Sequence, residues 1–258
     1  MRKHLIRAAV LGTVIALAVA ASAFGSKPKL VRVGNLFLRD NGGITPTKLP
    51  RHKQAPISAY INGRIGTVDG THPPAIESVV ADFDKTIQVN AKGLPVCNKV
   101  QLTARSSVDV KKACPDAIVG EGKAEVEVAF PEQALIEAKG PILIFNGGVH
   151  NGHTLLFIHT YVNVPAPTAV VATVELSPIN RGHYGLHAEA QIPKIAGGYG
   201  SVTKYKFRIG RDFTYKGEEQ SFLTASCPTG VYYAEGKVRF SDDTLLKVTH
   251  AFPCTPRD

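Results

Sequence analysis

Alternation of apolar and polar residues with a period of two dominates the chain after residue 27. In the segment 123–130, apolar residues occupy the even positions, while Lys123, Glu125 and Glu127 occupy odd ones. The segment 204–209 repeats the pattern with its charges at even positions. This period is what a β-strand with one buried face produces. The same pattern, together with short apolar runs, predicts further strands at 57–65, 76–89, 142–145, 154–162, 169–176, 184–192, 221–226, 231–240 and 244–249.

Clusters of Gly, Pro, Asn and Asp separate these segments, as expected of turns between short strands. About a dozen such strands predict an all-β fold with an antiparallel β-sandwich architecture. A parallel β-helix is the competing β fold, but it requires a repeat of roughly 20 residues, and the sequence has none. The only plausible turn of helix is at 132–138, between Pro131 and Gly140.

One segment indicates a division of the chain. Residues 164–167 read Val-Pro-Ala-Pro, which favours a short stiff linker. It would separate a β domain at 24–164 from another at 168–258, each with one pair of cysteines. A Cys-Pro step followed by Glu-Gly-Lys occurs in both parts, within 114–123 and within 227–237. Two related β modules are therefore one hypothesis, and one large sandwich is the alternative.

The four cysteines form an even set without any Cys-x-x-Cys spacing. Such spacing is typical of zinc and redox sites, so structural disulfides are the favoured interpretation. Four cysteines allow three pairings. Proximity favours Cys97–Cys114 and Cys227–Cys254, and each bridge would stabilise the fold by roughly 3 kcal/mol on loop-entropy grounds.

The amino-terminal residues predict export. Arg2, Lys3 and Arg7 precede an apolar run at 8–20, and the small residues of Ala21-Ser22-Ala23 follow it. This order is typical of a secretory signal peptide at 1–23. The run is about 13 residues long, whereas a spanning helix needs roughly 20, so we expect no membrane span in the mature chain. The predicted localisation is secreted or in the cell envelope.

Net charge limits the candidate partners. Removal of residues 1–23 takes away three basic residues and no acidic ones, so the formal charge falls from +9 to +6. A moderate positive charge favours anionic surfaces, such as an acidic cell-wall polymer. Nucleic-acid binding is not expected, because it would need a basic stripe with aromatic platforms and the densest basic stretch is the short segment 48–53. The absence of Trp also disfavours, without excluding, a sugar-stacking platform.

Histidines give the best concentration of metal-ligand side chains. His150 and His153 flank an Asn-Gly turn, His159 follows on the next predicted strand, and His72 could join them from elsewhere. Their spacing matches no zinc pattern, so a polar hairpin tip is the favoured interpretation. No cofactor is expected, because the glycine-rich loop at 193–200 lies between strands and does not precede a helix, as phosphate-binding loops do.

Catalytic chemistry is weakly supported. Asp82 and Asp84 flank Phe83 and would share one strand face, a separation that glycoside hydrolysis can use. Same-face residues on any solvated strand have that separation, so a surface role is favoured. The string Asp-Gly-Thr-His-Pro-Pro at 69–74 would hold His72 rigidly, which suits a site or a plain connector. We name no catalytic residue, and whether the protein is an enzyme stays open, with a non-enzyme favoured.

Several strings are similar to those of uncharacterised secreted β-rich proteins of soil actinobacteria, a group with no attached activity. The resemblance rests on residues 39–43, 69–74, 93–97, 114–115, 145–148, 192–198 and 213–215. It covers most of the chain after residue 23. It implies export and a disulfide framework, and it assigns no functional residue.

These observations favour an exported, non-enzymatic extracellular or cell-envelope protein with a binding or structural role. A secreted hydrolase acting on a polysaccharide or lipid-like substrate is one alternative. A metal-binding module that uses the histidine hairpin is the other.

Overall fold

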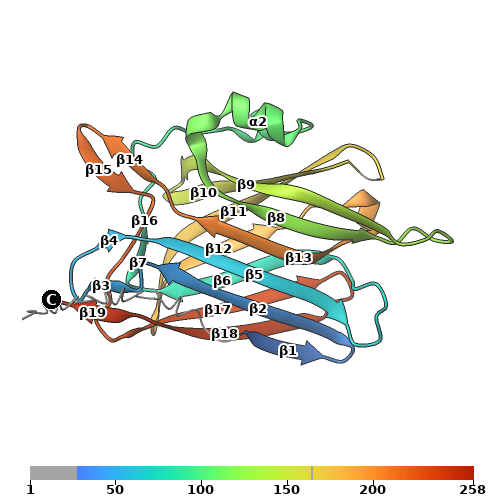
Figure 1. The fold of residues 1–258 in the computed structure, drawn as a ribbon, viewed down its shortest axis with the longest axis horizontal. Helices are drawn as coiled ribbons and strands as arrows, with labels where there is room; N and C mark the ends of the chain where they lie inside the picture. The colour runs from blue at the N-terminus through green and yellow to red at the C-terminus, as the bar shows by residue number, and fades with distance from the viewer. Residues whose placement is uncertain (1–27, 164) are drawn as a thin grey trace, which may run out of the picture.

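A computed structural model describes residues 28–163 and 165–258, and it consists mainly of antiparallel strands (Figure 1). The predicted signal peptide at 1–23 lies outside the described residues. Twelve strands form one sheet. In spatial order they are β1 (Lys29–Val33), β2 (Leu36–Thr45), β5 (Ser58–Thr67), β13 (Gly200–Ile209), β8 (Ile118–Val128), β9 (Ile136–His150), β10 (His153–Val162), β11 (Thr168–Arg181), β12 (Tyr184–Gln191), β6 (Ile76–Asp84), β17 (Val231–Phe240) and β18 (Leu245–Pro253).

The sheet curls until its two edges meet. β1 lies against β18, and β18 also approaches β2, although no ladder of paired residues joins them among the described residues. The expected β-rich class is confirmed, whereas a sandwich of two separate sheets is not clearly present. The main sheet is instead continuous, nearly closed and barrel-like. Neighbouring strands all pair antiparallel, with β1 and β18 at the two edges, and the regular twist of so many strands brings the edges together.

Strands from the two halves of the chain alternate within this sheet. β13 lies between β5 and β8, and β6 lies between β12 and β17. The strands on either side of residues 164–167, β10 and β11, pair directly with each other. The repeated Glu-Gly-Lys fragment falls within β8 and β17, but a common origin of two modules stays a prediction.

Short elements cover the ends and one side of the sheet. β4 (Ala55–Pro56), β16 (Leu223–Ala225) and β7 (Ile87–Val89) form a three-stranded sheet, β14 (Asp212–Tyr215) pairs with β15 (Glu218–Ser221), and β19 (Thr255–Arg257) runs parallel to β3 (Lys48–Pro50). The helices are α1 (Lys99–Leu102) and α2 (Ser107–Ala113), followed by 3₁₀ turns at Pro115–Ala117 and Ala196–Gly198. Among the described residues, no helix has the length and apolar character that a membrane span requires.

The expected helical turn at 132–138 is wrong. Residues 131–133 form a turn and β9 begins at Ile136, because the inward positions Ile136, Ala138 and Gly140 continue a two-residue period into that strand. The helices form instead at 99–102 and 107–113. Asn98 caps α1 in a capping box with Gln101, and a side-chain cap also begins α2; such caps satisfy backbone donors that a short helix leaves free.

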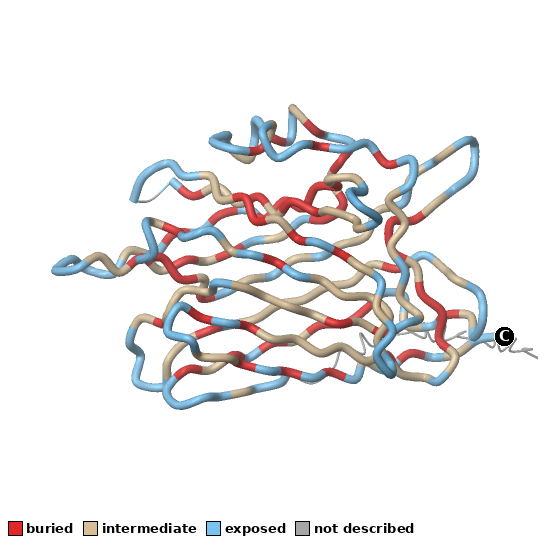
Figure 2. Tube along the Cα trace, turned by 180° about the vertical axis from the view of Figure 1, so that it is seen from behind, coloured by how far each residue is buried: buried red, intermediate tan, exposed pale blue. Residues whose placement is uncertain are grey.

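The two disulfides join Cys97 to Cys114 and Cys227 to Cys254, the pairing favoured by proximity. The first joins the residues that flank α1 and α2 and so closes this helical cover, which packs on the outer face of β9, β10 and β11. Under the cover lies a second core that includes Leu143, Phe145, Phe157 and Val171. The strands beneath the cover are therefore buried on both faces (Figure 2).

A buried side-chain pair bridges the seam between the two edges of the sheet. His250 Nε2 on β18 lies 3.0 Å from Asp40 Oδ1 on β2, and the two side chains are 7% and 4% exposed. The His250 ring also stacks on Phe252. Because backbone pairing is absent between β2 and β18 in the described chain, this pair is a principal polar link across the seam.

We expect Asp40→Ala to destabilise the protein by about 3–5 kcal/mol, because it removes the buried carboxylate that His250 contacts across the seam. Chemical unfolding monitored by circular dichroism measures this loss. Asp258→Ala is the control, since its carboxylate is 93% exposed and should matter by less than about 0.5 kcal/mol. Equal stability of the two variants would contradict a structural role for the seam pair.

Candidate functional site

The inner face of the barrel-like sheet encloses an apolar cavity of about 370 Å³, here called the lumen. The lumen is lined almost entirely by aliphatic and aromatic side chains. Those from the sheet include Ile61, Val79, Ala81, Phe83, Ala124, Ile142, Ile144, Leu156, Ile158, Val170, Ala172, Val174, Leu176, Leu186, Ala188, Ala190, Val202 and Phe207. These are the inward positions of the period-two pattern, so the sequence predicted their burial but not the space between them.

Strand number and small residues together explain the space. Eight strands close around an interior that side chains can just fill, and the diameter grows with each added strand. Alanines also occupy facing inward positions, because Ala81 on β6 lies directly opposite Ala188 on β12. The twelve-stranded wall therefore leaves room that its own side chains do not occupy.

Two hydroxyl groups interrupt the apolar lining. Thr160 Oγ1 is buried and has no hydrogen-bond partner among the described residues. The Tyr205 ring crosses Gly63, where an added Cβ would lie 2.3 Å from the ring. Burial, and secondarily the charge of Asp40, raises the pKa of Tyr205, so this phenol stays neutral and can donate a hydrogen bond.

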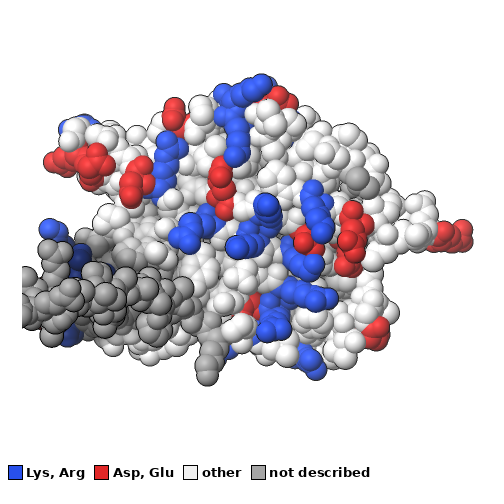
Figure 3. Space-filling view, viewed as in Figure 1, with Lys and Arg blue, Asp and Glu red and all other residues white. Residues whose placement is uncertain are grey.

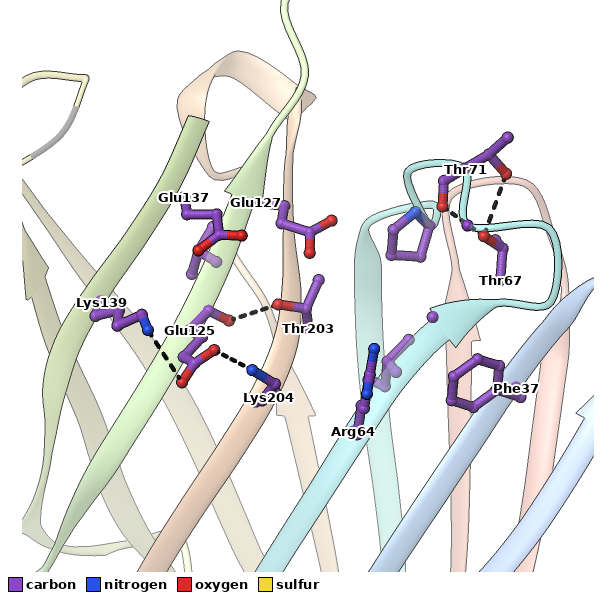
Figure 4. Close-up of a pocket in the computed structure, with 15 residues that line it drawn as sticks. Phe37, Arg64, Thr67, Thr71, Glu125, Glu127, Glu137, Lys139, Thr203 and Lys204 are labelled. Atoms are coloured by element: carbon purple, nitrogen blue, oxygen red, sulfur yellow. Dashed lines mark hydrogen bonds and ion pairs between the residues drawn. The ribbon is translucent and has the colours of Figure 1, made fainter. Parts of the chain in front are cut away.

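A smaller hollow of about 220 Å³, here called the side opening, lies where β5 and β13 part (Figure 4). Their ladder ends at the pair Arg64–Lys204. Beyond this pair, β5 continues its ladder with β2, and β13 continues its ladder with β8. Ile65 and Val126 line both the side opening and the lumen, so the two cavities adjoin.

Charged side chains surround the side opening. Glu125 lies 2.5 Å from Lys204 Nζ and 3.6 Å from Lys139 Nζ. The Lys204 side chain is the main reason that the pKa of Glu125 lies below its ordinary value. Glu127, Glu137 and Arg64 complete the polar rim.

The loop with the Asp-Gly-Thr-His-Pro-Pro string borders the side opening and is held by its own polar groups. Asp69 Oδ1 accepts bonds from the backbone N–H and the hydroxyl of Thr71, at 3.0 and 2.7 Å. A hydrogen bond with Asn35 and then those from Thr71 lower the pKa of Asp69. The rigidity expected of this string is therefore present in its hydrogen bonds.

His72 and Ser201 form a latch rather than a nucleophilic pair. Ser201 Oγ donates to the Pro73 carbonyl at 2.6 Å and lies 3.1 Å from His72 Nε2. Since the only hydroxyl proton points at Pro73, His72 Nε2 must donate to Ser201. Ser201 is also 2% exposed. His72 Nδ1 also lies 3.8 Å from Glu127 Oε2. Because Ser201 is buried and its proton is directed at Pro73, this arrangement does not favour a nucleophilic serine.

The four candidate metal-binding histidines do not converge. His150 and His153 face each other across the β9–β10 turn, and His153 Nδ1 contacts Glu175. His159 lies six residues further along β10, about 20 Å away, and His72 belongs to the latch described above. Among the described residues, no group of three or more His, Cys, Asp or Glu side chains could hold a metal ion.

Asp82 and Asp84 face outward from β6, away from the lumen, and both are occupied. Asp82 lies 2.6 Å from His187 Nδ1 and pairs with Arg181. Asp84 accepts bonds from the backbone and hydroxyl of Thr86 and from the Tyr233 backbone N–H. Both residues are buried, at 5% and 6% exposed, so the surface role expected of them is wrong. Their carboxylates are held by these partners, and this geometry does not favour the paired-carboxylate chemistry of glycoside hydrolysis.

No family model matches the chain, and the searches of curated proteins and of solved structures found no match.

Burial of His159 beneath the helical cover makes the stability of the protein depend on pH. The His159 side chain is fully buried, and its Nε2 lies 3.0 Å from the Arg105 carbonyl between α1 and α2. Burial lowers the pKa of His159, and the Arg105 hydrogen bond opposes this only in part. The unfolded chain therefore binds a proton at His159 more readily than the folded one does. The contribution of neutral, buried His159 to the free energy of unfolding is complete above pH 6.5, the ordinary pKa of histidine, and falls as the pH drops below that value.

We expect the wild-type protein to lose more stability than His159→Gln between pH 7 and pH 5. Chemical unfolding at each pH gives the free energy of unfolding, and its slope against pH is compared between the two proteins. His150→Gln is the control, because His150 is exposed and its removal should leave the slope unchanged. Parallel pH profiles for wild type and His159→Gln would contradict the prediction.

Proposed function

We propose that this protein is an exported, non-enzymatic carrier that binds a small apolar molecule, such as a lipid with one acyl chain, inside the lumen. The observation that carries the proposal is the apolar cavity of about 370 Å³ within the sheet. Binding sites for small molecules usually measure about 300–1,000 Å³ and combine a mainly apolar lining with a few polar groups. The lumen has this composition, with Thr160 and Tyr205 as its hydroxyls.

The energy of an unfilled lumen supports a ligand. Cavities made by mutation in protein cores cost about 24 cal/mol per Å³. On that scale an empty lumen would cost about 9 kcal/mol, which is comparable to the whole stability of a typical domain, about 5–15 kcal/mol. An apolar ligand would restore the lost contacts, and its burial would add the hydrophobic contribution.

The unpaired Thr160 hydroxyl indicates where a polar atom of the ligand would lie. Buried polar groups in proteins nearly always have a hydrogen-bond partner. A ligand with a hydroxyl, carbonyl or carboxyl group near Thr160 would supply it. The ligand is therefore an apolar chain with one polar end and not a pure hydrocarbon.

Export rests on the sequence of residues 1–23 and on the resemblance to secreted actinobacterial proteins. The two disulfides are consistent with it, because disulfides persist in oxidising compartments. No group of metal-ligating side chains among the described residues supports the metal-binding alternative. In the part of the chain that the structure describes, the hydrolase alternative has only the contacts of His72 with Ser201 and Glu127, in which the Ser201 proton is directed at the Pro73 carbonyl. An affinity for acidic cell-wall polymer would rest on charge alone.

The first test identifies the ligand. The protein is purified without detergent, and native mass spectrometry compares its mass before and after organic extraction. We expect a bound small molecule that extraction releases, and a lower melting temperature for the extracted protein, because ligand binding stabilises the folded state by mass action. The extracted protein should regain the higher melting temperature when a medium-chain fatty acid is added.

The second test fills the lumen. Ala188→Phe projects a ring from β12 into the lumen, so we expect binding of a fluorescent fatty acid to weaken at least about tenfold, a loss of about 1.4 kcal/mol. Ala251→Phe is the matched control, since Ala251 is exposed on β18. Ala81→Phe fills the same space from the opposite strand, and thermal unfolding shows that each variant is folded. Unchanged binding by both folded lumen variants would place the ligand elsewhere.

A further inference from the structure

Neighbouring strands present like charges to one another on the outer face of the sheet. Arg39 on β2 lies opposite Arg64 on β5, which lies opposite Lys204 on β13. In the next outward row, Lys206 on β13 lies opposite Lys123 on β8. Like charges directly opposite each other in an antiparallel pair are destabilising. The fold therefore holds these cations together at a cost to its own stability.

Carboxylates do not neutralise most of this charge. Within residues 28–163 and 165–258, no ion pair involves Arg39, Arg64, Lys123 or Lys206, whereas Lys204 pairs with Glu125. We call these five cations the basic face. Figure 3 shows Lys and Arg side chains gathered across the middle of this side of the molecule, over β5 and β13.

The basic face borders the side opening. Arg64 and Lys204 are the last paired residues before β5 and β13 part, and both line that opening. Ile65 and Val126 line both the opening and the lumen, so these two buried side chains lie between the two cavities. The rim of the opening also carries Glu125, Glu127 and Glu137. The cations without an ion pair among the described residues, Arg39, Arg64, Lys123 and Lys206, therefore lie beside this mixed rim and would be the groups that attract an anionic surface.

We propose that the basic face docks on an anionic lipid bilayer and brings the side opening against the membrane, where an apolar chain passes between bilayer and lumen. This inference rests on the proposed function, since it uses the lumen as the destination of the chain. Phosphate and glycerol-phosphate headgroups would bind the lysines and arginines. A bilayer is favoured over a soluble acidic polymer because only a bilayer uses both the charges and the adjoining apolar cavity.

The test measures co-sedimentation of the full chain with phosphatidylcholine vesicles, with and without phosphatidylglycerol, at low and high ionic strength. We expect binding only with phosphatidylglycerol, weakened by salt. Each cation near an anionic membrane contributes roughly 1 kcal/mol, so Arg64→Gln combined with Lys206→Gln should weaken binding about 30-fold. The matched control is Lys216→Gln combined with Lys247→Gln, which removes the same charge from other faces and should bind as the wild type does.

A transfer assay separates this inference from the proposed function. The protein is loaded with a pyrene-labelled fatty acid, and its release to vesicles is followed by fluorescence. If docking occurs, the transfer rate rises with vesicle concentration and with phosphatidylglycerol content, and the basic-face variant loses this dependence without losing fatty-acid affinity. A rate independent of vesicle concentration, or equal binding by the basic-face and control variants, would overturn docking while leaving the lumen site intact. Vesicle binding by a protein that takes up no fatty acid would overturn the carrier function and leave the docking surface.

Discussion

Closure of a twelve-stranded sheet around more volume than its side chains can fill is the constraint on which the structure depends. Most inward residues are apolar, because the wall has no free backbone groups to offer to its interior. The exceptions include Thr160 and Tyr205 in the lumen and Asp40, which contacts His250. Even large side chains at these positions do not reach across the lumen to the opposite wall, so the interior of the sheet is only partly filled. One end is covered by the short strands and by the Cys227–Cys254 bridge, within a core that includes Phe222 and Tyr232 (Figure 1). The lumen is thus a consequence of topology as much as of side-chain choice.

The same alternation that makes the lumen also arranges the outer surface. Because β13 turns Tyr205 and Phe207 inward, it must turn Lys204 and Lys206 outward. Register between strands then decides which charges become neighbours, and here it places cations beside cations over β2, β5 and β13. Where β5 and β13 part, inner and outer faces meet, so the charged exterior and the apolar interior lie within a few residues of each other.

Local patterns in the sequence sufficed for most strands, because burial of one face leaves a period of two. They did not suffice where a partner distant in the chain decides the conformation. β2 was not predicted, because Asp40 breaks the alternation and is accommodated inside only through His250, 210 residues away. α1 and α2 are too short to show a helical stripe and depend on caps and a disulfide.

The candidate site was harder to predict than the fold, for related reasons. The apolar residues of the lumen look like ordinary core residues in sequence, since whether opposite walls touch depends on how many strands close the sheet. The charges of the basic face come from four strands, so the sequence shows only the alternating cations of 204–209 and not the neighbours that Arg39, Arg64 and Lys123 supply from other strands. The histidines of 150–159 are close in sequence, but strand geometry turns His159 under the helical cover and leaves His150 at an exposed turn.

The helical cover and the seam lie on opposite sides of the sheet, which gives the wall an uneven stiffness. β9 and β10 are held between the lumen on one face and the disulfide-linked helices on the other. At the seam, β18 contacts β1 and β2 without a backbone ladder among the described residues, and the Asp40–His250 pair bridges the two edges. Backbone hydrogen bonds therefore resist separation of the strands at the back of the wall, whereas side-chain packing and a buried polar pair resist it at the seam. If the lumen binds a ligand as proposed, the seam is the part of the wall where a wider ligand would be accommodated.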